Sequence, residues 1–407
     1  MVQGNSPIGA GRAAYDRRRF LRNAGLGIAG LAGGVLLEAC GSTTASSTTT
    51  TASAGGGPTT TEGMAALEAA AKTEGMLNLI ADPYNWANYG TQSMPNTVIG
   101  EFHTLYGIQC PVVNPEGTSA EELAAINADK GTQKAPDAVD VSLAIAAQGA
   151  TQGVFAPYKV STWDDIPASM KDPNGVWTGD YYGVISFGTN TKVVANPPKS
   201  WSDLLKPEYK GQVAIDGSPA AAGDALAAVF SAALANGGSL DNIMPGLEFF
   251  QHLKSVGNFN PVDCYSANIV SGQTPIAIIW DYLNVGYRKQ YPNIDYVVSL
   301  PTTGKYGGIY CQAVNSTAPH PNAAKLWMEY LYSDQGQLEY LAGYVHPARY
   351  ASMLAAGKIP ASLIAKLQAA GVPTAADYAG AQFATLDQIT KASALCVANW
   401  DKMVGGV

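Results

Sequence analysis

The chain has 407 residues, enough for two domains with separate hydrophobic cores. It is 47% hydrophobic and only 14% charged, against about a quarter charged in ordinary globular domains, so we expect a large and well-buried body. The formal net charge is −8, and no basic cluster occurs after the first 25 residues, which argues against nucleic acid as a partner.

The N-terminal segment has the pattern of an export signal. Arginines at positions 17–19 and 22 precede a mildly apolar run, residues 24–37, which is too short for a membrane-spanning helix of roughly 20 residues. The segment 1–39 resembles a bacterial twin-arginine signal peptide joined to a lipoprotein cleavage box, although Glu38 is unusual at its position. The resemblance implies that Cys40 receives a diacylglyceryl group and becomes the new N-terminus.

Residues 40–62 form a stretch rich in serine and threonine, which we expect to be a flexible linker because it cannot form a core. Two acyl chains on Cys40 would anchor the protein stably. The sequence therefore predicts an extracytoplasmic protein, lipid-anchored to the outer face of the bacterial cell membrane. Cleavage would remove five arginines and two acidic residues, so the net charge would change from −8 to −11.

Four further cysteines, Cys110, Cys264, Cys311 and Cys396, lack the close spacing of a zinc or redox site. Disulfides are compatible with a location outside the cell. Buried thiols are equally compatible, because twin-arginine export carries proteins out already folded. Both interpretations stay open.

The first part of the body predicts the order β-α-β-α-β and hence a largely parallel sheet. The expected elements are a helix at 63–73, a strand at 76–81, a helix at 91–106, a strand at 108–113, a helix at 119–129 and a strand at 138–143. The loop after the first strand carries Asp82, Asn85 and Trp86, which suggest a binding wall; a surface loop with inward aromatic packing fits equally well. Ser119 and Glu122 match a capping box, and this helix N-terminus would point N–H groups toward a cleft.

The elements expected after residue 143 contain two further candidate binding residues, Tyr182 and Ser218. Tyr182 precedes a strand at 184–194, and Ser218 is expected to cap a helix at 220–235 that has Pro219 at its first position. The further expected elements are a short helix at 197–205, a strand at 210–215, helices at 240–256 and 265–271, a strand at 294–300, a return crossing at 305–314, a helix at 322–332 and a mostly helical tail at 361–404 that closes the first lobe.

The stretch 276–290 contains the residues most strongly expected to bind a ligand. The apolar run 276–279 indicates a strand buried on both faces, and 282–290 indicates a helix. Trp280, Asp281 and Tyr282 therefore fall at the carboxyl edge of an α/β sheet, where ligands bind. Asp281 also suits a helix cap and Trp280 suits a core, and both roles are compatible with a cleft. Tyr310 and Tyr182 flank the predicted crossings and are further cleft candidates.

Several segments together resemble the solute-binding proteins of ABC importers, of the two-lobed periplasmic-binding type. The segments are 199–205 (KSWSDLL) before 209–211, 279–281 (IWD) and 318–327 (APHPNAAKLW), followed by 332–337 (YSDQGQ). The resemblance is strongest to the branch that binds polyamines, thiamine or ferric iron. It implies two lobes, each a mixed, mainly parallel sheet flanked by helices, joined by a two-strand hinge near 186–192 and 298–306. Lobe 1 would comprise 63–188 and 301–407, and lobe 2 would comprise 189–300.

Three ligand classes compete. A polyamine-like organic cation is favoured, with Asp281 as counter-charge and with Trp280, Tyr282 and Trp86 stacking on the cation. Ferric iron is less favoured, because iron binders of this type carry adjacent tyrosines where this chain has Asp281-Tyr282-Leu283. A phosphonate or another anion would sit at helix N-termini, which are common features of any α/β fold.

No catalytic signature is present, and we expect a binding protein without cofactor or metal. The four histidines are scattered, and neither a Gly-x-Ser-x-Gly elbow nor a phosphate loop occurs. A secreted hydrolase is the alternative of another class, because a distant carboxylate pair leaves no local signature; a surface adhesin would need no cleft. By resemblance, the expected partners are a small solute and a membrane permease, and the protein is expected to be a monomer.

Overall fold

A computed structural model describes Gly57, residues 60–374 and residues 376–405. The predicted signal peptide, Cys40 and nearly all of the predicted linker lie outside the described residues. The described residues belong to one compact unit. Within the described ranges, no helix combines the length and apolar character that crossing a membrane requires.

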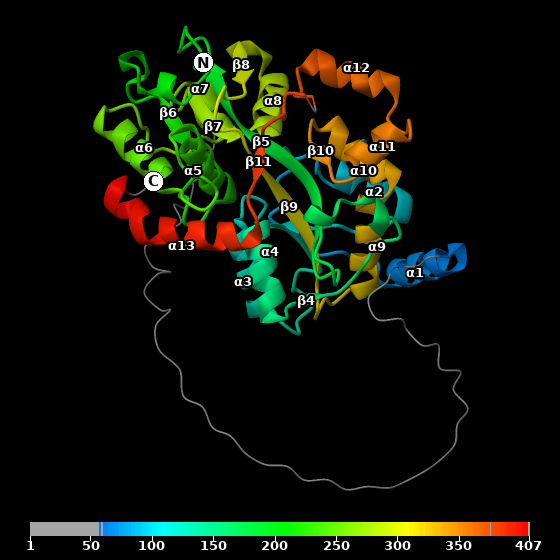
Figure 1. Cartoon of the computed structure of the whole chain (residues 1–407). Helices are drawn as coiled ribbons and strands as arrows, with labels where there is room; N and C mark the ends of the chain where they lie inside the picture. Colours follow the sequence, from blue (N-terminus) through cyan, green and yellow to red (C-terminus); the bar gives the residue numbers. More distant parts are fainter. Residues whose placement is uncertain (1–56, 58–59, 375, 406–407) are drawn as a thin grey trace, which may run out of the picture. The chain divides into compact units, whose positions relative to one another are not determined.

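Helices and strands alternate along most of the described chain (Figure 1). The helices are α1 (Thr61–Glu74), α2 (Val98–Tyr106), α3 (Ser119–Ala128), α4 (Leu143–Gln152), α5 (Gly223–Ala235), α6 (Met244–Ser255), α7 (Ser266–Ser271), α8 (Asp281–Gln290), α9 (Pro321–Leu331), α10 (Asp334–Ala342), α11 (Tyr350–Ala355), α12 (Ala361–Ala370) and α13 (Leu386–Met403). The strands are β1 (Leu79–Ile80), β2 (Val112–Val113), β3 (Ala138–Ser142), β4 (Phe155–Ala156), β5 (Thr178–Asn190), β6 (Val213–Ile215), β7 (Ile276–Trp280), β8 (Tyr296–Ser299), β9 (Tyr306–Asn315), β10 (His346–Pro347) and β11 (Gln382–Phe383).

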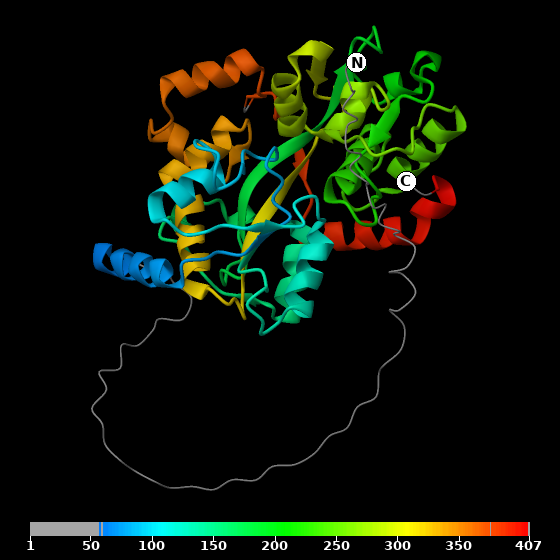
Figure 2. The ribbon, with the colours of Figure 1, turned by 180° about the vertical axis from the view of Figure 1, so that it is seen from behind.

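The long strand β5 joins two groups of strands. Its first half pairs with β9 and β10, and its second half pairs with β7 and β8. The change of partner falls between Val184, which is opposite Gly307, and Ile185, which is opposite Trp280. This point lies just before the range 186–192 that the sequence suggested for the first crossing. Figure 2 shows β5 and β9 running side by side, as their antiparallel pairing requires.

The two-lobed, mixed α/β class is confirmed, but the strand pairing is less parallel than expected. The parallel pairs are β1–β2, β6–β7 and β9–β11. Strand β3 was expected to continue a parallel sheet and instead pairs antiparallel with β9. The reason lies in β9, a strand from much later in the chain that inserts between β3 and β5.

Two helix starts differ from the sequence prediction. Helix α5 begins at Gly223 rather than at 220, because the N–H groups of Ala221 and Ala222 both donate to the Ser218 carbonyl in a preceding turn. Ser218 is therefore not its cap. The capping box of α3 is formed by Thr118 and Glu121 instead of Ser119 and Glu122, because Thr118 has the extended backbone of a cap.

The C-terminal helix α13 packs against α6 and also contacts α4 and α5. Trp400 of α13 lies edge-on to Phe250 of α6, with ring centroids 5.4 Å apart, and also contacts Phe259. Both phenylalanines fall within the range expected for lobe 2. The predicted lobe boundaries stay a prediction, but α13 joins the α5–α6 side because burying the Trp400 indole there removes a large apolar surface from water.

A third segment accompanies the two expected crossings. Residues 376–385, which we call the strap, connect α12 to α13 and contain β11, which pairs with β9 at Tyr306 and Gly307 (Figure 1). The expected two-strand hinge of β5 and β9 thus has a short parallel strand along one edge.

The four cysteines of the described region are buried and free. Burial raises the pKa of the Cys110 and Cys396 thiols to about 12. These thiols are therefore protonated and poorly nucleophilic at neutral pH.

Candidate functional site

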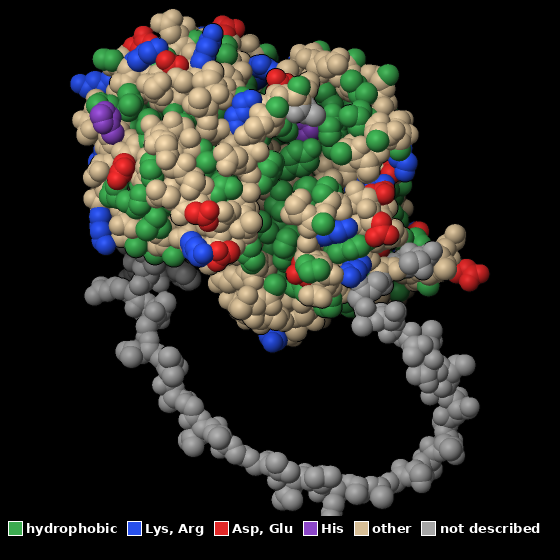
Figure 3. Space-filling view, viewed as in Figure 1, with side chains coloured by type: hydrophobic (Ala, Val, Ile, Leu, Met, Phe, Trp, Pro, Cys, Tyr) green, Lys and Arg blue, Asp and Glu red, His purple; other side chains and the backbone are tan. Residues whose placement is uncertain are grey.

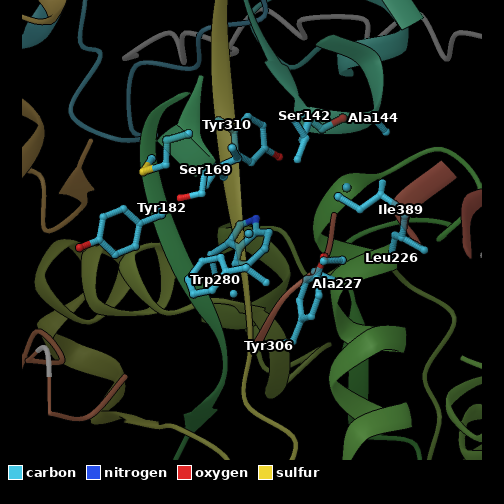
Figure 4. Close-up of a pocket in the computed structure, with 18 of the residues that line it drawn as sticks. Ser142, Ala144, Ser169, Tyr182, Leu226, Ala227, Trp280, Tyr306, Tyr310 and Ile389 are labelled. Atoms are coloured by element: carbon cyan, nitrogen blue, oxygen red, sulfur yellow. The ribbon is translucent and has the colours of Figure 1, made fainter. Parts of the chain in front are cut away.

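A cavity of about 310 Å³ lies beside β9, where segments from distant parts of the chain meet. Hydrophobic side chains gather in the hollow along the middle of the face in Figure 3, and Figure 4 shows the lining in detail. Its principal walls are formed by Ser142, Leu226, Trp280, Tyr306, Tyr310 and Ile389. No Lys, Arg, Asp or Glu is among the described residues that line it.

Two helix N-termini meet at this cavity. Ser142 ends β3 just before α4, and Gly223 begins α5. A Cβ atom at Gly223 would lie 3.2 Å from the Ser142 Cβ, so glycine permits this close approach. The first N–H groups of any helix lack intrahelical partners, and neither N-cap side chain supplies an acceptor here, although in α5 Asp224 Oδ1 accepts the Ala225 N–H at 2.8 Å.

Two glycines of β9 give aromatic rings room to lie against the strand. A Cβ at Gly308 would be 2.5 Å from the Trp280 ring, and one at Gly307 would be 2.4 Å from the Phe383 ring. The cavity wall therefore consists of an indole and a phenyl ring placed directly on the β9 backbone.

Next to the cavity, aromatic side chains from four separate segments converge. We call Trp86, Tyr181, Tyr282 and Tyr310 the aromatic cluster. The Tyr310 ring lies 5.6 Å from both Trp86 and Tyr181, and Tyr282 lies 6.0 Å from Trp86. Trp280 stacks on Tyr282 at 6.4 Å and links the cluster to the cavity. The sequence predicted every member except Tyr181.

Hydrogen bonds to the buried Asp140 hold part of the aromatic cluster in position. The Trp86 indole donates to the Tyr181 hydroxyl at 2.8 Å, and that hydroxyl donates to Asp140 Oδ2 at 2.6 Å. Tyr89 donates to the same oxygen at 2.8 Å. Asp140 thus orients Tyr181, which in turn orients Trp86.

Asp140 belongs to a group of four buried carboxylates, which we call the acidic core: Asp82, Glu122, Asp140 and Asp180. None of them forms an ion pair within the described part of the chain. Burial raises the pKa of Asp140 to about 7, and burial together with the neighbouring carboxylates raises the pKa of the other three. The group therefore retains protons near neutral pH.

A second acidic pair lies on the α5 side. Burial raises the pKa of Asp224 to about 6, and burial and the neighbouring Asp224 raise the pKa of Asp216. Burial and then the charge of Asp224 are the main causes that raise the pKa of Tyr310. Neither aspartate is ion-paired in the described region, and Asp224, with the lower pKa, carries the negative charge of the pair at neutral pH.

Asp281 is fully buried, and its carboxylate is occupied by protein donors. Oδ1 accepts the Val184 N–H at 3.0 Å, and Oδ2 accepts the Tyr378 hydroxyl of the strap. It does not cap α8 through its side chain. Burial raises the pKa of Asp281 to about 6, and these hydrogen bonds limit the increase.

The predicted site residues fall into three groups. Trp280, Tyr182 and Tyr310 line the cavity, while Trp86 packs against Tyr310 and Tyr282 packs against Trp86 and Trp280. The others lie off the cavity wall: Asp82 in the acidic core, Asp281 beneath the hinge, Asn85 half-buried in its loop, Ser218 in the turn before α5, and Ser119, whose Oγ accepts the Ser142 N–H at 3.0 Å.

Sequence reasoning missed several wall residues. Ser142 ends a predicted strand, so the strand-edge argument applied to it as well as to Trp280. Leu226, Phe383 and Ile389 carried no signal, because ordinary apolar residues reveal their location only through packing. Within the described chain, no cluster of three or more His, Cys, Asp and Glu side chains is placed to hold a metal ion.

The class that this arrangement defines is a two-lobed solute-binding fold with a site beside its crossing strands. Residues 145–370, more than half of the chain, match the family described as bacterial extracellular solute-binding protein. The chain belongs to this family.

An uncharacterised Haemophilus influenzae protein is 26% identical over 231 residues, 54% of this chain. The match spans 64% of that protein's length.

Solved structures share the fold and bind different ligands. The periplasmic binding protein AfuA of Actinobacillus pleuropneumoniae, with fructose-6-phosphate bound, has a TM-score of 0.57 at 18% identity over 81% of this chain and 98% of its own. A putative spermidine/putrescine ABC transporter from Listeria monocytogenes has 0.59 at 13%, over 80% and 98%. Iron-bound HitA of Pseudomonas aeruginosa has 0.57 at 17%, over 79% and 98%. These likenesses show that the chain shares this fold.

Proposed function

We propose that the protein is the extracytoplasmic solute receptor of an ABC importer. It captures one small solute in the cavity, delivers it to a membrane permease and catalyses no reaction. The observation that carries this proposal is the convergence of Ser142, Leu226, Trp280 and Tyr310, from four distant segments, on a single cavity beside the crossing strands. Ligand pockets typically occur where domains meet.

Binding would act through the hinge. Strands β5 and β9 connect the two groups of elements, and a solute that touches both groups favours their closed arrangement by its differential affinity. The closed complex would present a surface to the permease. X-ray scattering should show compaction when the solute binds, and unchanged dimensions in the saturated complex would contradict hinge closure.

A polyamine-like organic cation is the solute class that the site supports best. The aromatic cluster offers ring faces for cation–π contact. Asp224, whose pKa burial raises to about 6, is still ionised at pH 7, has no ion-pair partner in the described region and acts on Tyr310, so its field favours a cation near the rings. In this proposal Asp224 contributes the counter-charge, together with or in place of Asp281.

An anion is the second candidate, favoured by one observation. The first turn of α4 carries no acidic residue and its cap Ser142 makes no side-chain bond, so its N–H groups suit a phosphate or carboxylate. At the facing helix, Asp224 lies in the first turn and opposes a negative ligand. Ferric iron has less support, because burial raises the pKa of Tyr282 and Tyr310 and so disfavours phenolate ligands.

Replacing Trp280 with alanine should weaken binding of spermidine at least about 100-fold, because one wall of the cavity and its ring face are lost. Isothermal titration measures this change, and Trp177→Ala, a half-buried tryptophan away from the cavity, is the control. Mass spectrometry of the co-purified small molecule would identify the natural solute. Equal affinity in the Trp280 variant would remove the triplet from the site, and turnover of the bound molecule would favour a hydrolase.

Replacing Cys40 with alanine should release the full-length protein into the medium of a bacterium that exports it, because the diacylglyceryl anchor needs the thiol. Cell fractionation and immunoblotting measure the release, and Cys110→Ala, which changes a buried thiol of the body, is the matched control. Retention of the Cys40 variant at the membrane would contradict lipidation.

A further inference from the structure

The strap, residues 376–385, is attached to the hinge at three points. Its β11 pairs in parallel with β9 at Tyr306 and Gly307. The Lys305 ammonium donates to the Asp377 carbonyl at 2.7 Å. The Tyr378 hydroxyl bonds to Asp281, whose other oxygen accepts the Val184 N–H where β5 changes partners.

Tyr378 connects two elements that the chain separates widely. Its hydroxyl donates to Asp281 Oδ2 at the start of α8 and lies 3.0 Å from His346 Nδ1 of β10. Because burial lowers the pKa of His346 to about 4, the imidazole is neutral at pH 7; since the hydroxyl hydrogen goes to Asp281, the His346 Nδ1–H donates to the Tyr378 oxygen. The hydroxyl therefore bridges β10 and α8 beside the hinge.

The strap also forms part of the cavity wall. Phe383 and Ala384 line the cavity, together with Ile389 one turn into α13. The Phe383 ring rests on Gly307, yet its side chain is 44% exposed. A two-residue strand and a half-exposed ring hold this wall more weakly than the β5–β9 ladder holds the other side.

We propose that the strap is a gate of the cavity and that Tyr378 is its latch. Breaking the bond between Tyr378 and Asp281 lets the strap lift from β9, which moves Phe383 off Gly307 and opens the cavity from the α13 side. The gate deepens the proposed function, because it matters for import only if the solute enters this cavity.

The gate can be tested without any solute. A thiol introduced by Leu226→Cys lines the cavity, whereas the cysteines of the described body are buried, and Cys40→Ser removes the anchor thiol. In this background, Tyr378→Phe should increase the rate of labelling by N-ethylmaleimide roughly tenfold, because it removes a hydrogen bond to a buried carboxylate. Tyr350→Phe is the matched control, because its ring also contacts His346 but its hydroxyl makes no bond to Asp281.

Equal labelling rates in the Tyr378 and Tyr350 variants would overturn the gate. If Tyr378→Phe does not fold, Lys305→Met replaces it in the test, because it removes the bond to the Asp377 carbonyl. This variant should raise the rate of N-ethylmaleimide labelling, and an unchanged rate would likewise overturn the gate. If Tyr378→Phe speeds labelling but no solute binds in the cavity, the gate is supported and the proposed function is refuted. If a solute binds but the labelling rates are equal, the proposed function is supported and the gate is refuted.

Discussion

Replacing Asp281 with alanine is expected to lower the free energy of unfolding by about 3 kcal/mol, because two donors lose a charged acceptor in a fully buried place. The Val184 N–H would be left without its acceptor in a buried place, and the Tyr378 hydroxyl would keep only its contact with His346 Nδ1. Urea denaturation followed by circular dichroism measures the loss. An unchanged urea midpoint would contradict this structural role.

Asp281→Asn separates the structural role from a role in solute binding. An asparagine keeps an oxygen for Val184 and a polar group for Tyr378, so it should cost less than half as much stability as alanine. It also removes the negative charge. If Asp281 is a counter-charge for a cationic solute, the asparagine variant should lose spermidine affinity while its unfolding curve stays near that of the parent.

Raising the pH from 6.5 to 8 is expected to lower the free energy of unfolding by about 2 kcal/mol or more. The acidic core has pKa values raised by burial, to about 7 for Asp140. A raised carboxyl pKa means that the folded state holds its proton more tightly than the unfolded chain does. Its contribution to stability is therefore complete below about pH 4 and is lost as the pH rises through the folded-state value.

The pH window from 6.5 to 8 avoids the titration of His346, which changes stability in the opposite direction. Burial lowers the pKa of His346 to about 4, so below about pH 6.5 its imidazole is protonated in the unfolded chain but not in the folded protein. Stability therefore falls as the pH falls below that value. Between pH 6.5 and 8 the carboxylates dominate. Urea midpoints at the two pH values measure the effect, and Asp140→Asn should flatten the slope. Stability that rises with pH across this window would show that the acidic core is ionised in the folded protein.

The sequence predicted the position of the buried strand that ends at Trp280. The apolar run 276–279 could only be a buried segment, and the following helix had its own pattern, so β7 and α8 were predicted within one residue. The rings of Trp86, Tyr282 and Tyr310, which the sequence also suggested, lie together with Trp280 in the structure, while their role in binding stays a prediction.

The position of helix starts was harder to predict. Ser218 followed by Pro219 has the composition of a helix start, yet a turn uses the Ser218 carbonyl and delays α5 until Gly223. Ser119 is one residue away from the true cap, Thr118. Local capping patterns compete with one another over a few residues, and the packing of the helix decides among them.

The sequence by itself determined most of the strands and helices and the buried strand before the Trp-Asp-Tyr triplet, because these depend on periodicity and on short local patterns, while the two-lobed class followed from the resemblance of several short segments to a known family. The tertiary structure alone decided that β9 inserts between β3 and β5, that the strap adds Phe383 to the cavity, and that the Asp281 carboxylate bonds to Val184 and Tyr378. These features join residues far apart in the chain, 97 positions apart for the two bonds of Asp281, and the free energy that selects such contacts comes from burying both partners together, which no local pattern records.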